Sequence, residues 1–125
     1  MKQYFDKLMA LSELKLKRDL KGTWSEGSST YFKALFDELD EVKEELHSDR
    51  RCYLEDELGD VLWDYLCLLK HLENEKKIDI NSLLQRANKK YDRRVIGIIN
   101  GETWDVIKSE QKQLLENEQK ELSIK

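Results

Sequence analysis

Residues 51–74 read RCYLEDELGDVLWDYLCLLKHLEN, the longest segment of helical pattern in the chain. Its apolar side chains recur every three or four residues and no proline interrupts them, so we expect a single helix across it. The apolar positions are Leu54, Leu58, Val61, Leu62, Tyr65, Leu66, Leu69 and Leu72. Because they cover more than one side of the helix, we expect a central helix with neighbours on several faces.

Helical spacing on both sides of this stretch predicts further helices over about residues 2–20, 29–47, from 80 toward 94, and from 104 to about 121. Leu35, Leu39, Val42 and Leu46 mark a buried stripe on the second, which Ser28 or Ser29 is expected to cap. The β-branched run 95–99 has no partner strand, so we predict a helix end or a turn there. The prediction is an all-α, four- or five-helix bundle in one domain over 1–125, with a solvated tail from about 116.

The composition of the chain limits where the protein is expected to be located and which partners it is expected to bind. The chain has 125 residues, no long apolar run and no signal-like N-terminus, so we expect a cytoplasmic protein without a membrane segment. Between residues 37 and 64, twelve acids face three bases, a net charge of −9, and the rest of the chain therefore carries +5. So acidic a block disfavours nucleic acid as a partner. The two cysteines lack metal-ligand spacing.

Two pairs of acids stand at helical spacing on neighbouring helices. Glu38 and Glu41 are three residues apart, and Glu57 and Asp60 repeat this spacing. If the two helices pack antiparallel, the four carboxylates gather and need a cation, for which an all-oxygen set favours Mg²⁺ or Mn²⁺. Solvated helix faces are the alternative interpretation. Gly59 stands inside this helix, where a glycine costs about 1 kcal/mol relative to alanine. Its presence indicates that a metal or a crossing backbone needs room there.

These residues resemble a known family. Residues 38–41 (ELDE) and 57–62 (ELGDVL), fifteen residues apart, are similar to the ExxE…ExxD signature of the all-α nucleoside triphosphate pyrophosphohydrolases, specifically the MazG-like group. Residues 90–94 (KYDRR) resemble the KxxRR segment of that group, and Trp104 resembles its closing tryptophan. The likeness covers roughly residues 24–112 and indicates a single-domain member.

The resemblance implies Mg²⁺-dependent hydrolysis of nucleoside triphosphates to the monophosphate and pyrophosphate, in nucleotide-pool house-cleaning or regulation. Relatives of this kind work as homodimers or homotetramers. The implied metal ligands are Glu38, Glu41, Glu57 and Asp60, with Glu41 or Glu45 acting on the attacking water. The implied substrate contacts are Lys90, Arg93 and Arg94 for the phosphates, and Trp24, Trp63 and Tyr91 for the base.

A simpler structural explanation exists for each of these groups of residues. The three cations can instead complement the dipole at the end of their helix, and the aromatic residues can be core. A non-catalytic helical interaction module with an acidic patch is the alternative function, which unchanged stability in millimolar Mg²⁺ would favour. A di-iron site needs two Glu-x-x-His motifs and the chain has one, at Glu44 and His47. We therefore expect His47 and His71 to be surface or satisfied residues.

Overall fold

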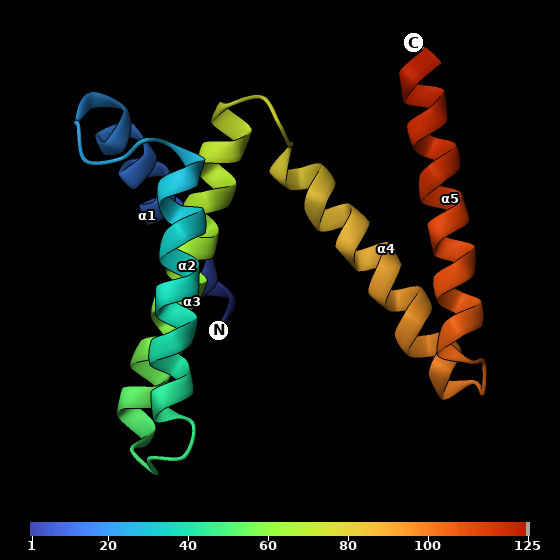
Figure 1. The fold of residues 1–125 in the computed structure, drawn as a ribbon, viewed down its shortest axis with the longest axis horizontal. Coiled ribbons are helices and arrows are strands. Elements are labelled where there is room, and N and C mark those ends of the chain that lie inside the picture. Colours follow the sequence, from blue (N-terminus) through green and yellow to red (C-terminus); the bar gives the residue numbers. More distant parts are fainter. Residues whose placement is uncertain (125) are drawn as a thin grey trace. The chain divides into compact units, whose positions relative to one another are not determined.

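The computed structural model describes residues 1–124, which form five helices and no strand (Figure 1). The helices are α1 (Lys2–Lys21), α2 (Ser28–Glu45), α3 (Arg51–Asn74), α4 (Ile80–Ile99) and α5 (Trp104–Ile124). The predicted all-α class is confirmed. Across residues 1–124, every helix is too short or too polar to span a membrane.

The chain divides into two compact units, Met1–Ile80 and Asn81–Lys125. The first unit holds α1, α2 and α3, and the second holds α5 with nearly all of α4. The helix bounds lie within a few residues of those predicted. The exception is α5, which continues to Ile124 through the segment predicted as a tail, with exposed side chains beyond Gln111. The single domain over residues 1–125 stays a prediction.

In the first unit, α2 and α3 lie side by side and antiparallel, because only residues 46–50 connect them (Figure 1). The buried centre of the pair is made by Tyr31, Cys67 and Leu68, with Leu35, Trp63 and Leu72 packed against it. Helix α1 packs on α3. Because α2 and α3 lie side by side, their pairing determines which residues of one helix lie opposite which residues of the other.

A buried carboxylate joins the three helices of this unit. Asp19 of α1 accepts hydrogen bonds from the Tyr31 hydroxyl of α2 at 2.5 Å and from His71 Nε2 of α3 at 2.9 Å, and it pairs with Lys15. The Asp19 and His71 side chains are only 2% and 3% exposed. Burial alone would raise the pKa of Asp19, but these hydrogen bonds outweigh burial and lower it. His71 is a satisfied residue, as expected.

The N-terminus of α2 is capped from a distance. Neither Ser28 nor Ser29 makes the predicted side-chain cap, because Gly27 holds the cap position with φ +99°, which favours glycine. Instead, the Ser28 backbone N–H donates to Glu75 Oε2 at 2.8 Å, and the Ser28 hydroxyl donates to Glu75 Oε1 at 2.7 Å. A carboxylate at the end of α3 thus satisfies the start of α2, where negative charge is favourable.

In the second unit, residues 95–99 form the end of α4, as one of the two alternatives predicted. A Cβ on Gly97 would lie 2.6 Å from Ile107 Cδ1, so glycine lets fully buried Ile107 approach α4 closely. The basic segment lies earlier in α4, and the last turn carries no basic residue. The interpretation that these cations complement the end of the helix dipole is therefore wrong.

Gly59 has open space around it: apart from its own stretch of helix, no atom of residues 1–124 lies within 4 Å of an added Cβ. The crossing backbone, one of the two alternatives predicted for Gly59, is absent from residues 1–124. Gly59→Ala should therefore raise the free energy of unfolding by about 1 kcal/mol, the usual helix cost of glycine. Chemical denaturation measures this, with Gly97→Ala as a matched control that should lose stability through collision with Ile107. A destabilised Gly59→Ala would show that this space is filled in solution.

Candidate metal centre

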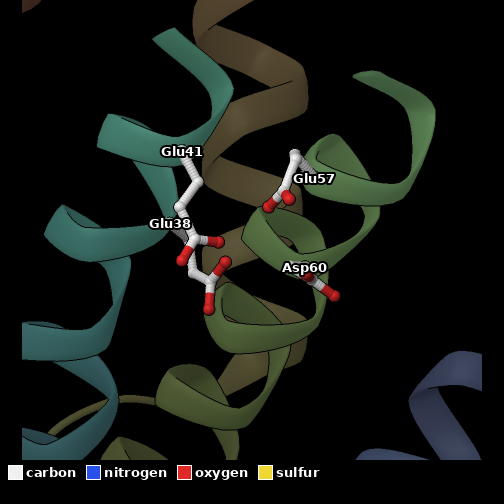
Figure 2. A group of neighbouring side chains, drawn as sticks. All are labelled: Glu38, Glu41, Glu57 and Asp60. Atoms are coloured by element: carbon white, nitrogen blue, oxygen red, sulfur yellow. The ribbon is translucent and has the colours of Figure 1, made fainter. Parts of the chain in front are cut away.

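Four carboxylates meet between α2 and α3. One oxygen each of Glu38, Glu41, Glu57 and Asp60 can be chosen so that all four lie within 4.8 Å of one another. Figure 2 shows Glu38 and Glu41 on one helix and Glu57 on the other directed into the space between them. The spacing of three residues aligns each pair on its helix, and the antiparallel pairing brings the two pairs to one level.

The cluster has a surplus of negative charge. Among the described residues, none of its four members forms an ion pair with a lysine, arginine or histidine. Burial, followed by the neighbouring Glu41, raises the pKa of Glu38 to about 7. The adjacent Glu41 carboxyl group, followed by burial, raises the pKa of Glu57 to about 7. Burial, followed by Asp56 and Glu41, also raises the pKa of Asp60.

Two oxygens of the cluster are orphaned. Glu38 Oε2 and Glu57 Oε2 are buried and have no hydrogen-bond partner within residues 1–124. A buried carboxylate oxygen without a partner is costly, and native proteins rarely leave one so. A cation between the two helices would satisfy both atoms, and carboxylate oxygens are the ligands that Mg²⁺ and Mn²⁺ prefer. The residues present therefore fit a divalent metal ion.

In the absence of divalent cations, we expect thermal stability to fall as the pH rises from about 5 to about 8. The pKa values of folded Glu38 and Glu57 are about 7, above their ordinary value of 4.5. Between these values the folded state binds more protons than the unfolded state, so this stabilisation is present at the acidic end and lost through pH 7. Millimolar Mg²⁺ should raise the melting temperature more at pH 8 than at pH 5.5, because it binds deprotonated carboxylates. Scanning fluorimetry checks both trends, and an equal Mg²⁺ response at the two pH values would contradict them.

Glu45, the second candidate to act on the attacking water, is engaged elsewhere. Its carboxylate accepts a hydrogen bond from the Ser48 hydroxyl at 2.6 Å and forms an ion pair with Arg50. The Ser48 hydrogen bond, followed by Arg50, lowers the pKa of Glu45. Glu45 therefore holds the turn between α2 and α3, while Glu41 lies in the cluster. Asp64, one turn beyond Asp60, adds to the negative field on Glu38.

The three predicted phosphate-binding cations lie on α4 in the second unit. Arg93 donates to both Glu102 oxygens at 2.6 and 2.9 Å, and to Glu110 at 2.9 Å. Arg94 donates to Gln111 at 2.6 Å, with its guanidinium 4.7 Å from the Trp104 ring. Lys90 Nζ lies 5.8 Å from the Tyr91 ring. Of the three, only Lys90 keeps its charge without a polar partner among the described residues.

The predicted base-stacking residues differ in their surroundings. Trp63 packs against the buried centre of the first unit. Trp24 is exposed, meets the Tyr31 ring edge-on at 5.7 Å, and has Lys15 Nζ at 4.3 Å from its ring. Tyr91 is exposed on α4. Trp24 and Tyr91 thus offer accessible ring surface, whereas the surroundings of Trp63 fit the core alternative.

The helices and the carboxylate cluster define an all-α protein with a candidate divalent-metal centre between two antiparallel helices. A family model for the MazG nucleotide pyrophosphohydrolase domain matches residues 26–96. The match covers more than half of the chain, and the chain belongs to this family. It includes α2, α3 and most of α4, and leaves α1 outside. Searches of curated proteins and of solved structures each found no match.

Proposed function

We propose that this chain hydrolyses nucleoside triphosphates between the α and β phosphates, giving the monophosphate and pyrophosphate, and that it requires Mg²⁺ or Mn²⁺. The observation that carries the proposal is the pair of buried, unpartnered oxygens, Glu38 Oε2 and Glu57 Oε2, in a cluster with which no base in the described part of the chain forms an ion pair. Membership of the MazG nucleotide pyrophosphohydrolase family supports this reaction class.

Glu38, Glu41, Glu57 and Asp60 would hold the metal ion. Bound there, a divalent cation would neutralise the polyphosphate and polarise the attacked phosphorus. Without that neutralisation the four carboxylates would repel a substrate that carries about four negative charges. The acids on α2 and α3 would therefore orient the reacting phosphates only indirectly, through the positions in which their oxygens hold the metal ion.

We assign the orientation of the attacking water to Glu41 rather than Glu45. The Glu45 carboxylate already accepts from Ser48 and Arg50, which lowers its pKa and makes it a weaker base. Glu41 is exposed at the mouth of the cluster and interacts with both Glu38 and Glu57. A water molecule held there has an acceptor at hand for its proton.

Lys90 is the best candidate among the cations for the leaving pyrophosphate, because no carboxylate of the described residues forms an ion pair with it. Arg93 would have to leave Glu102 in the loop before α5, and Arg94 would have to leave Gln111 on α5, before either could bind phosphate. For the nucleobase, exposed Trp24 and Tyr91 remain the candidates, since aromatic faces stack on bases without a strict preference for sequence or type.

A panel of ribonucleoside, deoxynucleoside and damaged triphosphates tests the proposal directly. With Mg²⁺ or Mn²⁺, the purified chain should release pyrophosphate and not orthophosphate from at least one member, and a chelator should stop the release. Absence of turnover across the panel with both metals would overturn it. If Mg²⁺ also left thermal stability unchanged, the acidic patch would instead fit the non-catalytic interaction module.

A further inference from the structure

Trp24 lies in the loop between α1 and α2 and keeps 65% of its surface exposed, yet neighbouring side chains hold its ring in place. The ring meets the Tyr31 ring of α2 edge-on, with the two centroids 5.7 Å apart. The ammonium Nζ of Lys15 on α1 lies over the Trp24 ring, 4.3 Å from its centroid. Because these contacts fix the ring beforehand, a ligand that stacks on it loses little free energy in ordering it.

A buried carboxylate sets the position of Lys15. The Lys15 ammonium pairs with Asp19 Oδ1, and the Lys15 side chain is 34% exposed. The other oxygen of Asp19 accepts hydrogen bonds from Tyr31 and His71, so this carboxylate is fixed on both sides. All three helices of the first unit therefore contribute to holding the cation over the Trp24 ring.

Trp24 belongs to the same compact unit as the four carboxylates, whereas Tyr91, the other candidate for the nucleobase, belongs to the second unit. Tyr31, which contacts Trp24, precedes Glu38 by seven residues on α2. Seven residues make nearly two full turns, so the two side chains lie on the same side of the helix, about 10 Å apart along its axis. The sugar and the α-phosphate of a nucleotide span a distance of this order. A nucleotide with its phosphates at the carboxylate cluster therefore reaches the neighbourhood of Trp24 with its base.

We propose that Lys15 is a specificity-determining residue that makes this site prefer purine nucleotides. The π electrons of the indole are attracted by the ammonium above them. The exposed ring surface is then poorer in electrons and stacks best on a base that is rich in them. Purines are richer in electrons than pyrimidines and also cover more of an indole, so both effects favour adenine and guanine.

This inference rests on the proposed function, because it takes the ligand to be a nucleotide, and it adds the choice of base. An aromatic ring alone discriminates little between bases, so the preference has to come from what surrounds the ring. Lys15 and Trp24 both lie outside residues 26–96, so the family match leaves the choice of base open.

Binding of non-hydrolysable nucleotides to the full chain tests this without turnover. Isothermal titration calorimetry in Mg²⁺ compares the α,β-methylene analogues of ATP, GTP, CTP and UTP. The wild type should bind the purine analogues at least ~5-fold more tightly than the pyrimidine analogues, and Lys15→Met should lower this ratio about 2- to 5-fold, as expected for an exposed cation–π contact. Lys15→Arg keeps the cation and should keep the ratio. Lys17→Met, at an exposed lysine of the same helix, is the matched control and should leave the ratio unchanged.

The ratio distinguishes specificity from a merely structural role, because partial unfolding weakens the binding of all four analogues alike. Trp24→Leu should weaken purine binding by at least ~5-fold, the loss expected for one stacked base. Equal affinity of the wild type for the four analogues, binding of none of them, or an unchanged ratio in Lys15→Met would overturn the inference. Purine-selective binding that depends on Lys15, without release of pyrophosphate from ATP or GTP, would support it and contradict the proposed hydrolysis. Release of pyrophosphate without any preference for purines would do the reverse.

Discussion

Replacing Glu38 with glutamine should reduce pyrophosphate release by roughly 100- to 1000-fold, the loss typical of removing one charge-stabilising group from an active site. The same substitution should make the metal-free protein more stable near pH 8. Glutamine removes one of the crowded negative charges, and its amide can donate to the carboxylates of Glu41 or Glu57. Loss of turnover together with a gain in melting temperature distinguishes a metal ligand from a residue needed for folding.

Steady-state kinetics and scanning fluorimetry on one preparation give both readouts. Glu44→Gln, an exposed glutamate on the same helix outside the cluster, is the control and should leave turnover and melting temperature unchanged. Glu38→Gln should also lose most of the Mg²⁺-dependent rise in melting temperature. Retention of more than half of wild-type turnover would remove Glu38 from the metal centre.

Local periodicity predicted the helices well because a helix satisfies its own backbone within four residues. The proximity of the four acids could be predicted from the sequence for the same reason. It depends only on the spacing of three residues within each pair and on the short turn that makes the two helices antiparallel. Glu45 could have been recognised as a turn residue, because Ser48 and Arg50 follow it closely and both bind it.

Contacts between residues distant in the sequence leave no such pattern. Glu75 caps the start of α2 at Ser28 from 47 residues away, whereas the local sequence pointed to Ser28 or Ser29 for that role. His71 meets Asp19 across 52 residues, and an aspartate on an amphipathic helix is ordinarily solvated. The exposure of Leu39 was also unpredictable, because periodicity marks an apolar face without stating whether the same chain covers it.

Replacing Asp19 with alanine should cost about 3 kcal/mol of unfolding free energy, the lower end of the range for breaking a buried charged pair, because Lys15 keeps some contact with solvent. The variant leaves the Tyr31 hydroxyl and His71 Nε2 buried without their acceptor. Urea denaturation measures the loss. Glu13→Ala, which removes a partly exposed ion pair with Lys70 between the same two helices, is the matched control and should cost less than about 1 kcal/mol.

The pH dependence of this loss separates Asp19 from the acidic cluster. Hydrogen bonds lower the pKa of folded Asp19 below its ordinary value of 3.8, so its stabilisation is present above that pH and lost as the pH falls through the folded pKa. Glu38 and Glu57 act in the opposite direction, between about pH 5 and pH 7. Asp19→Ala should therefore flatten the acid limb of the stability profile and leave the neutral limb intact. An Asp19→Ala variant that loses no more stability than Glu13→Ala would mean that apolar packing alone holds α1 against α3.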